Sequence, residues 1–208
     1  MAERIYFGIR NNHVITKTAI FEWFSGFAVS QKQKSIASFH KSIESAGFRP
    51  LEVSTKSTVN LGQKLSAFNL TLNGNCLECI FQSSKVFQNG GPYEDILNMS
   101  PKDAKRDPRL KESGALRCFR YNEEDWELLP KTLFYDYIYY QAVRATLSEE
   151  ELQELTEYNA FTDIEFNSAK SINTQARAIA LVSLIYQEKH TLPDLNKAEF
   201  LELHKKYV

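Results

Sequence analysis

The sequence contains few residues of the kinds that mark secreted, membrane-spanning or disordered chains. Cysteine occurs three times in 208 residues, an odd number too small for a disulfide framework and suited to a reducing compartment. No window of about 18 apolar residues is present, and the first ten residues carry charges without an apolar signal-peptide segment. We therefore expect a cytoplasmic protein that has no membrane partner.

Glycine and proline are also scarce, with 8 and 6 residues, and no internal repeat or low-complexity tract divides the chain. Hydrophobic residues make up 43% and aromatic residues 12%, which is enough to bury a sizeable core. The length is typical of one domain. We expect a single domain over residues 1–208.

Metal and redox motifs are incomplete. Cys76 and Cys79 form a CxxC pair, but no second pair follows and the four histidines are scattered along the chain. A zinc site requires further ligands at regular spacing. The sequence therefore predicts neither a metal site nor a cofactor.

Charge is balanced overall but segregated along the chain. The formal net charge of −1 excludes a polybasic nucleic-acid binder. Residues 102–120 nevertheless carry seven basic and three acidic side chains, whereas residues 122–165 carry twelve acidic and two basic ones. Both segments can be solvated faces. The basic segment is also the best candidate for contact with phosphate groups.

Local patterns predict an α+β protein, mainly helical, with a small β-sheet. Three capping motifs mark helix starts: Ser100-Pro101, Ser148-x-x-Glu151 and Asn196-x-x-Glu199. Apolar spacing predicts helices over 131–147 and 171–188, and a C-terminal helix within 190–208. Strands are expected over 4–7, 51–54 and 65–72.

The segment 77–87 carries the most informative polar pattern. In a helix, Glu78, Gln82 and Lys85 lie on one face, and most other positions are apolar. A buried helix tolerates such a stripe only when the polar groups pair with one another or face a ligand. Both interpretations remain open: an internal network that holds the fold, or part of a site.

Aromatic residues offer two candidate platforms for flat ligands. The segment 21–27 places four rings near a glycine, which is typical of a core but is also found where rings stack on bases. Trp126 lies in an acidic, polar segment and is the better stacking candidate.

The segment 161–175 combines carboxylates with a helix start. Thr162-x-x-Glu165 fits a helix cap, which leaves Asp163 for chemistry. A helix start presents free N–H groups that bind phosphate, and Lys170 and Asn173 add donors there.

These residues, in this order, resemble the NADAR superfamily, whose members include YbiA-like N-glycosidases. The matching blocks are Phe24-Ser-Gly-Phe27, Glu78-x-x-Phe-Gln82-x-x-Lys85, Trp126, Asp163-x-x-Phe166 and Lys170-x-x-Asn173. Three departures from the family pattern are Gly26 for Asn, Cys79-Ile80 for His-Tyr, and Phe166 for Trp. They weigh against the small-molecule substrate of the YbiA type more than against the fold.

Further blocks resemble the NADAR branch encoded beside guanine-specific DNA ADP-ribosyltransferase toxins. They are QKQKSI at 31–36, LSAFNL at 65–70, KVFQNGGPYEDI at 85–96, KRDPRL at 105–110 and FTDIEFN at 161–167. The resemblance covers residues 21–185. It implies a NADAR fold and an antitoxin that hydrolyses the N-glycosidic bond joining ADP-ribose to guanine in DNA. The implied substrate is ADP-ribosylated DNA and the implied product is ADP-ribose. The cognate toxin is the implied functional partner, and whether it is also bound directly stays open.

Site residues follow from the matched blocks. The resemblance implies that Glu78 and Asp163 are catalytic acids, with general acid and base unassigned, and that Lys85 assists them. The implied ligand-binding residues are Phe24, Ser25, Gly26, Phe27, Gln82, Trp126, Lys170 and Asn173. The expected DNA contacts are Lys105, Arg106 and Arg109. Two alternatives stay open: a small-molecule N-glycosidase, and a non-catalytic antitoxin that binds ADP-ribose or the toxin.

Overall fold

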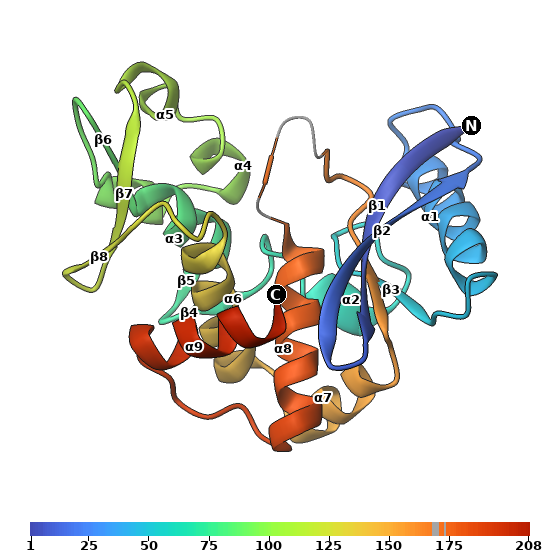
Figure 1. Ribbon diagram of the computed structural model, residues 1–208. Coiled ribbons are helices and arrows are strands. Elements are labelled where there is room, and N and C mark those ends of the chain that lie inside the picture. The colour runs from blue at the N-terminus through green and yellow to red at the C-terminus, as the bar shows by residue number, and fades with distance from the viewer. Residues whose placement is uncertain (168–170, 173) are drawn as a thin grey trace. The chain divides into compact units, whose positions relative to one another are not determined.

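A computed structural model describes residues 1–167, 171–172 and 174–208 of the chain (Figure 1). Two compact units are distinguished by their internal contacts. Unit 1 combines Met1–Ser66 with Leu147–Val208, and unit 2 is Ala67–Thr146. Both units contain helices packed on antiparallel strands, so the expected α+β class is confirmed.

Unit 1 is built on a four-stranded sheet with the order β2-β1-β9-β3. Its strands are β1 (Ala2–Arg10), β2 (His13–Phe21), β3 (Pro50–Glu52) and β9 (Ala160–Thr162). Its helices are α1 (Val29–Glu44), α2 (Asn60–Lys64), α7 (Glu149–Thr156), α8 (Gln175–Lys189) and α9 (Lys197–Tyr207). Strand β9 pairs antiparallel with β1 and parallel with β3, and this pairing brings residues 52 and 162 opposite each other.

The hairpin β1–β2 was predicted only in part, because its second strand alternates weakly. Asn11 and Asn12 form its two-residue turn with φ values of 51° and 58°. Positive φ at both turn positions matches the right-handed twist of the strands, and asparagine tolerates it. The turn fixes a register in which Ala2 faces Phe21 and Arg10 faces His13.

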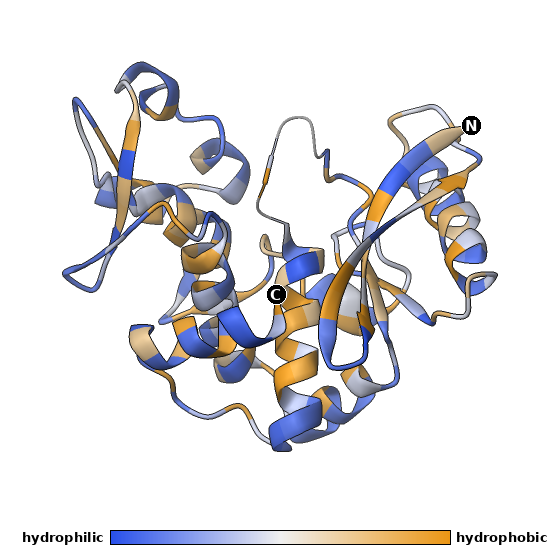
Figure 2. Cartoon of the chain, in the orientation of Figure 1, coloured by the Kyte–Doolittle hydropathy of each residue, from blue (hydrophilic) through white to orange (hydrophobic). Residues whose placement is uncertain are grey.

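Helices α1 and α8 lie on opposite faces of this sheet (Figure 1). Alternate residues of a strand point to opposite faces of the sheet. Tyr6 on β1 and Ala160 on β9 both point to the face that α1 covers. The buried cluster on that face comprises Tyr6, Phe21, Ile36, Phe39, Ile43, Phe48, Ala160 and Ile164. On the other face, α8 is apolar around its whole middle section (Figure 2).

Unit 2 contains a three-stranded sheet of order β6-β7-β8 and a two-stranded pair. Its strands are β4 (Thr71–Leu72), β5 (Asn75–Cys76), β6 (Lys85–Phe87), β7 (Leu116–Tyr121) and β8 (Glu124–Trp126). Its helices are α3 (Leu77–Ser83), the 3₁₀ helix η1 (Glu94–Asn98), α4 (Pro101–Ala104), α5 (Arg109–Glu112) and α6 (Leu133–Thr146). Stacked rings join these layers: Phe119 lies 5.3 Å from Phe81 and 4.6 Å from Phe134 between ring centroids.

All three capping motifs are confirmed. Ser148 and Asn196 open α7 and α9 with reciprocal capping boxes, and the Ser100 side chain accepts from the Asp103 N–H at the start of α4. Two predicted boundaries are wrong. The helix expected from residue 171 begins at Gln175, capped by Thr174, and only Thr71–Leu72 of the 65–72 segment is a strand.

Among the described residues, no helix is both long and apolar enough to cross a membrane.

Candidate functional site

Asp163 lies in unit 1 at the turn that follows β9. Its Oδ1 accepts the Glu165 N–H at 3.0 Å, and its Oδ2 accepts the Gln175 side-chain N–H at 3.0 Å. Burial, followed by the negative charge of Glu52, raises the pKa of Asp163 to about 7. An acid with a pKa near neutrality exchanges protons readily at physiological pH, which is the property that general acid or base catalysis requires.

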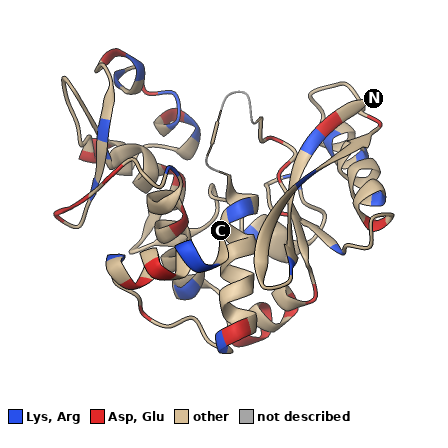
Figure 3. Ribbon diagram, in the orientation of Figure 1, with Lys and Arg blue, Asp and Glu red and all other residues tan. Residues whose placement is uncertain are grey.

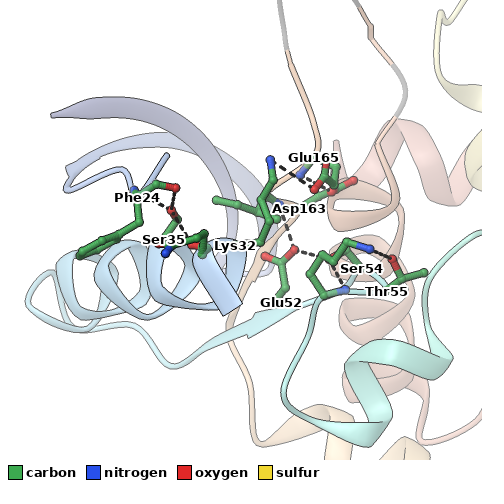
Figure 4. A network of polar contacts seen from close by, with 11 residues as sticks. Phe24, Lys32, Ser35, Glu52, Ser54, Thr55, Asp163 and Glu165 are labelled. Atoms are coloured by element: carbon green, nitrogen blue, oxygen red, sulfur yellow. Dashed lines mark hydrogen bonds and ion pairs between the residues drawn. The ribbon is translucent and has the colours of Figure 1, made fainter. Parts of the chain in front are cut away.

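Glu52, at the end of β3, is the partner of Asp163 that sequence reasoning missed (Figure 4). Glu52 is 2% exposed, and within the described part of the chain its carboxyl group accepts three hydrogen bonds. The donors are Ser54 Oγ at 2.6 Å, Thr162 Oγ1 at 2.6 Å and the Ile164 N–H at 2.9 Å. Burial nevertheless raises the pKa of Glu52 above its usual value.

His40 on α1 extends this network. Its Nε2 lies 2.8 Å from Thr162 Oγ1, so a neutral imidazole protonated on Nε2 donates to the hydroxyl that in turn donates to Glu52. Burial lowers the pKa of His40 to about 4. His40 is therefore neutral near pH 7.

The structure corrects the cap assigned to Glu165. Thr162 belongs to β9 and bonds Glu52, whereas the Asp163 side chain accepts from the Glu165 N–H and so forms the turn. The Glu165 side chain is exposed and lies 3.5 Å from Lys32 Nζ, which also lies 4.8 Å from the centre of the Trp23 ring. The network thus ends at the surface in an ion pair (Figure 4).

The loop 24–27 leads into α1 in unit 1. The Phe24 N–H donates to Ser35 Oγ at 2.9 Å, which anchors the loop to the helix (Figure 4). Phe27 is fully exposed, and Gly26 has a φ of +132°, a conformation that favours glycine. Ser25 is exposed as well. The loop therefore presents a ring and a hydroxyl to solvent, as a ligand-binding loop requires.

Glu78, Gln82 and Lys85 are brought together in unit 2. Gln82 Nε2 donates to Glu78 Oε1 at 2.8 Å, and Lys85 Nζ donates to Gln82 Oε1 at 2.6 Å. Within the described part of the chain, no other hydrogen bond reaches the Glu78 carboxyl group. Its second oxygen is available to a ligand.

The single long helix expected over 77–87 is wrong. Helix α3 ends at Ser83, and Lys85 begins β6, which pairs with β7. The hydroxyls of Ser83 and Ser84 both bond back to the Ile80 carbonyl, which competes with continued helical pairing. The contacts among Glu78, Gln82 and Lys85 form all the same, because the Lys85 side chain reaches Gln82 from the start of β6.

Burial lowers the pKa of Lys85 to about 8. The negative charge of Glu78 opposes this effect, and the positive charge of Lys105 adds to it. A lysine with this pKa is about one-tenth neutral at pH 7, far more than an ordinary lysine, so it can transfer a proton or act as a nucleophile.

Trp126 does not form the expected stacking wall. It is 1% exposed and packs in the core of unit 2, with its ring 4.5 Å from that of Tyr137 and 5.6 Å from that of Phe134. The acidic sequence around it is a short hairpin whose charged residues face outward while the indole faces inward. The core interpretation of Trp126 is therefore correct.

The basic segment, whose lysines and arginines are blue on α4, α5 and β7 in Figure 3, contains both ion-paired and solvent-facing residues. Arg109 forms bidentate contacts with Asp107 and with Asp95, and its guanidinium lies 4.5 Å from the Tyr93 ring centre. Its charge is balanced inside the unit, which contradicts the expectation that it is free for DNA. Lys105 and Arg106 are exposed, and among the described residues neither forms an ion pair.

Two expected ligand residues, Lys170 and Asn173, lie outside the described residues. Asp163 belongs to unit 1 and Glu78 to unit 2. No group of three or more potential metal ligands occurs in the described ranges. Cys76 and Cys79 instead bond backbone carbonyls, and burial raises the pKa of the Cys79 thiol to about 12.

The fold and these residues define an α+β protein with an acid of raised pKa in unit 1 and a Glu-Gln-Lys chain in unit 2. A profile of the DarT1-associated NADAR antitoxins matches residues 2–208, nearly the whole chain. The chain belongs to this antitoxin family. A search of curated proteins gave no match.

Proposed function

We propose that this antitoxin is an N-glycosidase that removes ADP-ribose from guanine in DNA and so reverses the modification made by its cognate toxin. The observation that carries the proposal is Asp163, a partly buried acid whose pKa of about 7 suits proton transfer. Family membership supplies the antitoxin role. The substrate and the reaction are our proposal.

Hydrolysis of this bond makes two chemical demands. Positive charge develops on the ribose as the bond to nitrogen breaks, and a nearby carboxylate stabilises it. The nitrogen leaves with difficulty unless it receives a proton, and water must lose one. A pair of carboxyl groups meets both demands, and we assign Asp163 and Glu78 to them without choosing which is the acid.

Glu78 suits this role because its carboxyl group is buried while one oxygen is uncommitted among the described contacts. Gln82 holds the other oxygen in place, and Lys85 holds Gln82. We propose that Lys85 supplies or accepts a proton or acts on the ribose, since its pKa of about 8 makes both forms available.

Recognition of the rest of the substrate is assigned to a surface loop, in which Phe24 is half-buried, and to exposed basic side chains. Phe24 and Phe27, with Ser25 and Gly26 between them, form the proposed ligand loop of unit 1. In unit 2, Lys105 and Arg106 are proposed to contact phosphates of the DNA strand, a contact that weakens with salt. Lys170 and Asn173 remain proposed partners of the diphosphate.

The experiment is a release assay on an oligonucleotide that carries ADP-ribose on one guanine. We expect free ADP-ribose and unmodified DNA, identified by mass spectrometry, from the wild-type protein. The Asp163→Asn and Glu78→Gln variants should each release less than about 1% of the ADP-ribose that the wild-type protein releases. A loss of this size is within the range that general acid–base catalysis contributes. Tight binding without release by the wild-type protein would instead indicate a non-catalytic reader.

A further inference from the structure

Glu52 contacts both chain neighbours of Asp163. Its Oε2 accepts from the Thr162 hydroxyl at 2.6 Å and its Oε1 from the Ile164 N–H at 2.9 Å. Residues 162 and 164 immediately flank the proposed catalytic acid. Any change in the position of the Glu52 carboxyl group therefore acts on the turn that carries Asp163.

Burying a carboxyl group at this position is costly. Glu52 is 2% exposed, and an amide or apolar side chain avoids the desolvation penalty. Three donors compensate for part of this penalty, one of them from Ser54 on the same strand end. Helix α2 also packs directly on the Glu52 backbone, since a Cβ at Gly62 would lie 2.1 Å from the Glu52 carbonyl oxygen. The strand end is thus held rigidly.

We propose that Glu52 is a positioning residue for Asp163 that fixes the turn over residues 162–164 through its bonds to both flanking residues. Three hydrogen bonds donated to the Glu52 oxygens favour its carboxylate form, and this negative charge in turn favours the protonated form of Asp163. This inference rests on the proposed catalytic role of Asp163. It is independent of which acid protonates the leaving group. Glu52 itself touches no substrate in this account.

The other polar groups around Asp163 come from three elements, of which the turn and α1 carry charged or titratable side chains. Glu165 follows in the same turn, and its charge acts in the same direction as that of Glu52. Lys32 on α1 pairs with Glu165, and His40 on α1 bonds Thr162 as a neutral ring. Helix α8 contributes the Gln175 amide. Glu52 differs from these groups because it both carries a charge near Asp163 and bonds the two residues that flank Asp163.

The first test measures the titration of Asp163 directly, by carboxyl-carbon NMR on the full chain. In Glu52→Gln the amide keeps the size and can still accept from the Ile164 N–H. We expect the Asp163 midpoint to fall from about 7 toward its ordinary value, because a like charge is removed. Glu165→Gln is the matched control: it removes a nearby charge without touching residue 162 or 164, and its effect should be smaller.

The second test uses turnover of ADP-ribosylated oligonucleotide. Glu52→Gln should lower kcat at least about tenfold with KM changed less than about twofold, since the misplaced acid acts in the transition state rather than in binding. It should also move the pH limb that reports Asp163 to lower pH. If the wild-type protein releases no ADP-ribose, the proposed function fails, and the NMR titration still decides the inference about Glu52.

Ser54→Ala covers the case in which Glu52→Gln does not fold. Loss of the Ser54 donor disfavours the charged form of Glu52, so the Asp163 midpoint should fall in the same direction by a smaller amount. An unchanged Asp163 midpoint in a folded Glu52→Gln or Ser54→Ala variant overturns the inference. Glu52 is then a structural carboxyl group only.

Discussion

Replacing Asp163 by asparagine should make the protein more stable at neutral pH. Asparagine resembles the protonated acid and can keep its bond from the Glu165 N–H, whereas the wild-type side chain must ionise beside Glu52 as the pH rises. An acid whose pKa is higher in the folded protein than in the unfolded chain makes its full contribution to stability at low pH. That contribution is lost as the pH rises through the folded pKa.

The magnitude follows from the two pKa values. The usual value of 3.8 and the folded value of about 7 differ by about three units, or about 4 kcal/mol in total. At pH 5 the wild-type protein has already lost part of this stabilising contribution. Between pH 5 and pH 8, the stability of Asp163→Asn relative to wild type should therefore rise by about 2 to 3 kcal/mol.

The assay is denaturant unfolding of both proteins at pH 5, 6, 7 and 8, with Glu165→Gln as an exposed control that should show a smaller trend. The expected difference grows up to about pH 7 and is then constant. A stability difference that does not vary between pH 5 and pH 8 would refute the reasoning, because Asp163 would then titrate as an ordinary surface acid.

Three further predictions concern unit 2. Trp126→Ala should destabilise the protein by about 3 to 5 kcal/mol in denaturant unfolding, because a core ring is lost. Unchanged stability would contradict the core position of the indole. Lys105→Glu with Arg106→Glu should slow turnover of modified DNA and flatten its salt dependence while sparing a modified nucleoside; equal loss on both substrates would exclude a phosphate contact. Arg109→Gln should lower the denaturation midpoint more than Lys111→Gln on the same helix, and should not reduce DNA turnover per folded molecule.

The capping motifs ahead of α4, α7 and α9, which depend on neighbours in sequence, were predicted correctly, whereas the cap assigned to Glu165 was not. The capping boxes at Ser148 and Asn196 are local, because three residues bring a side chain back to a free backbone N–H. The contacts among Glu78, Gln82 and Lys85 were also predicted, although the element containing Lys85 was not. Spacing alone could not place the helix end, which depends on serine hydroxyls and on pairing with β7.

Features that depend on distant pairing were missed. Glu52 and Thr162 are 110 positions apart, and only the parallel pairing of β3 with β9 brings them together. Glu52 lies within the strand predicted at 51–54, and a glutamate on the buried face of such a strand must find polar partners. Trp126 was misplaced for a related reason: polar neighbours in sequence do not determine the direction in which a strand residue points.

The central claim is that the antitoxin catalyses removal of ADP-ribose from guanine. The most direct measurement is the number of ADP-ribose molecules released per protein molecule from a large excess of modified oligonucleotide. The account predicts many turnovers for the wild-type protein, with guanine restored in the DNA, and fewer than one for Asp163→Asn at equal folded concentration. Release that stops at one equivalent, or an Asp163→Asn variant that turns over like the wild type, would contradict it.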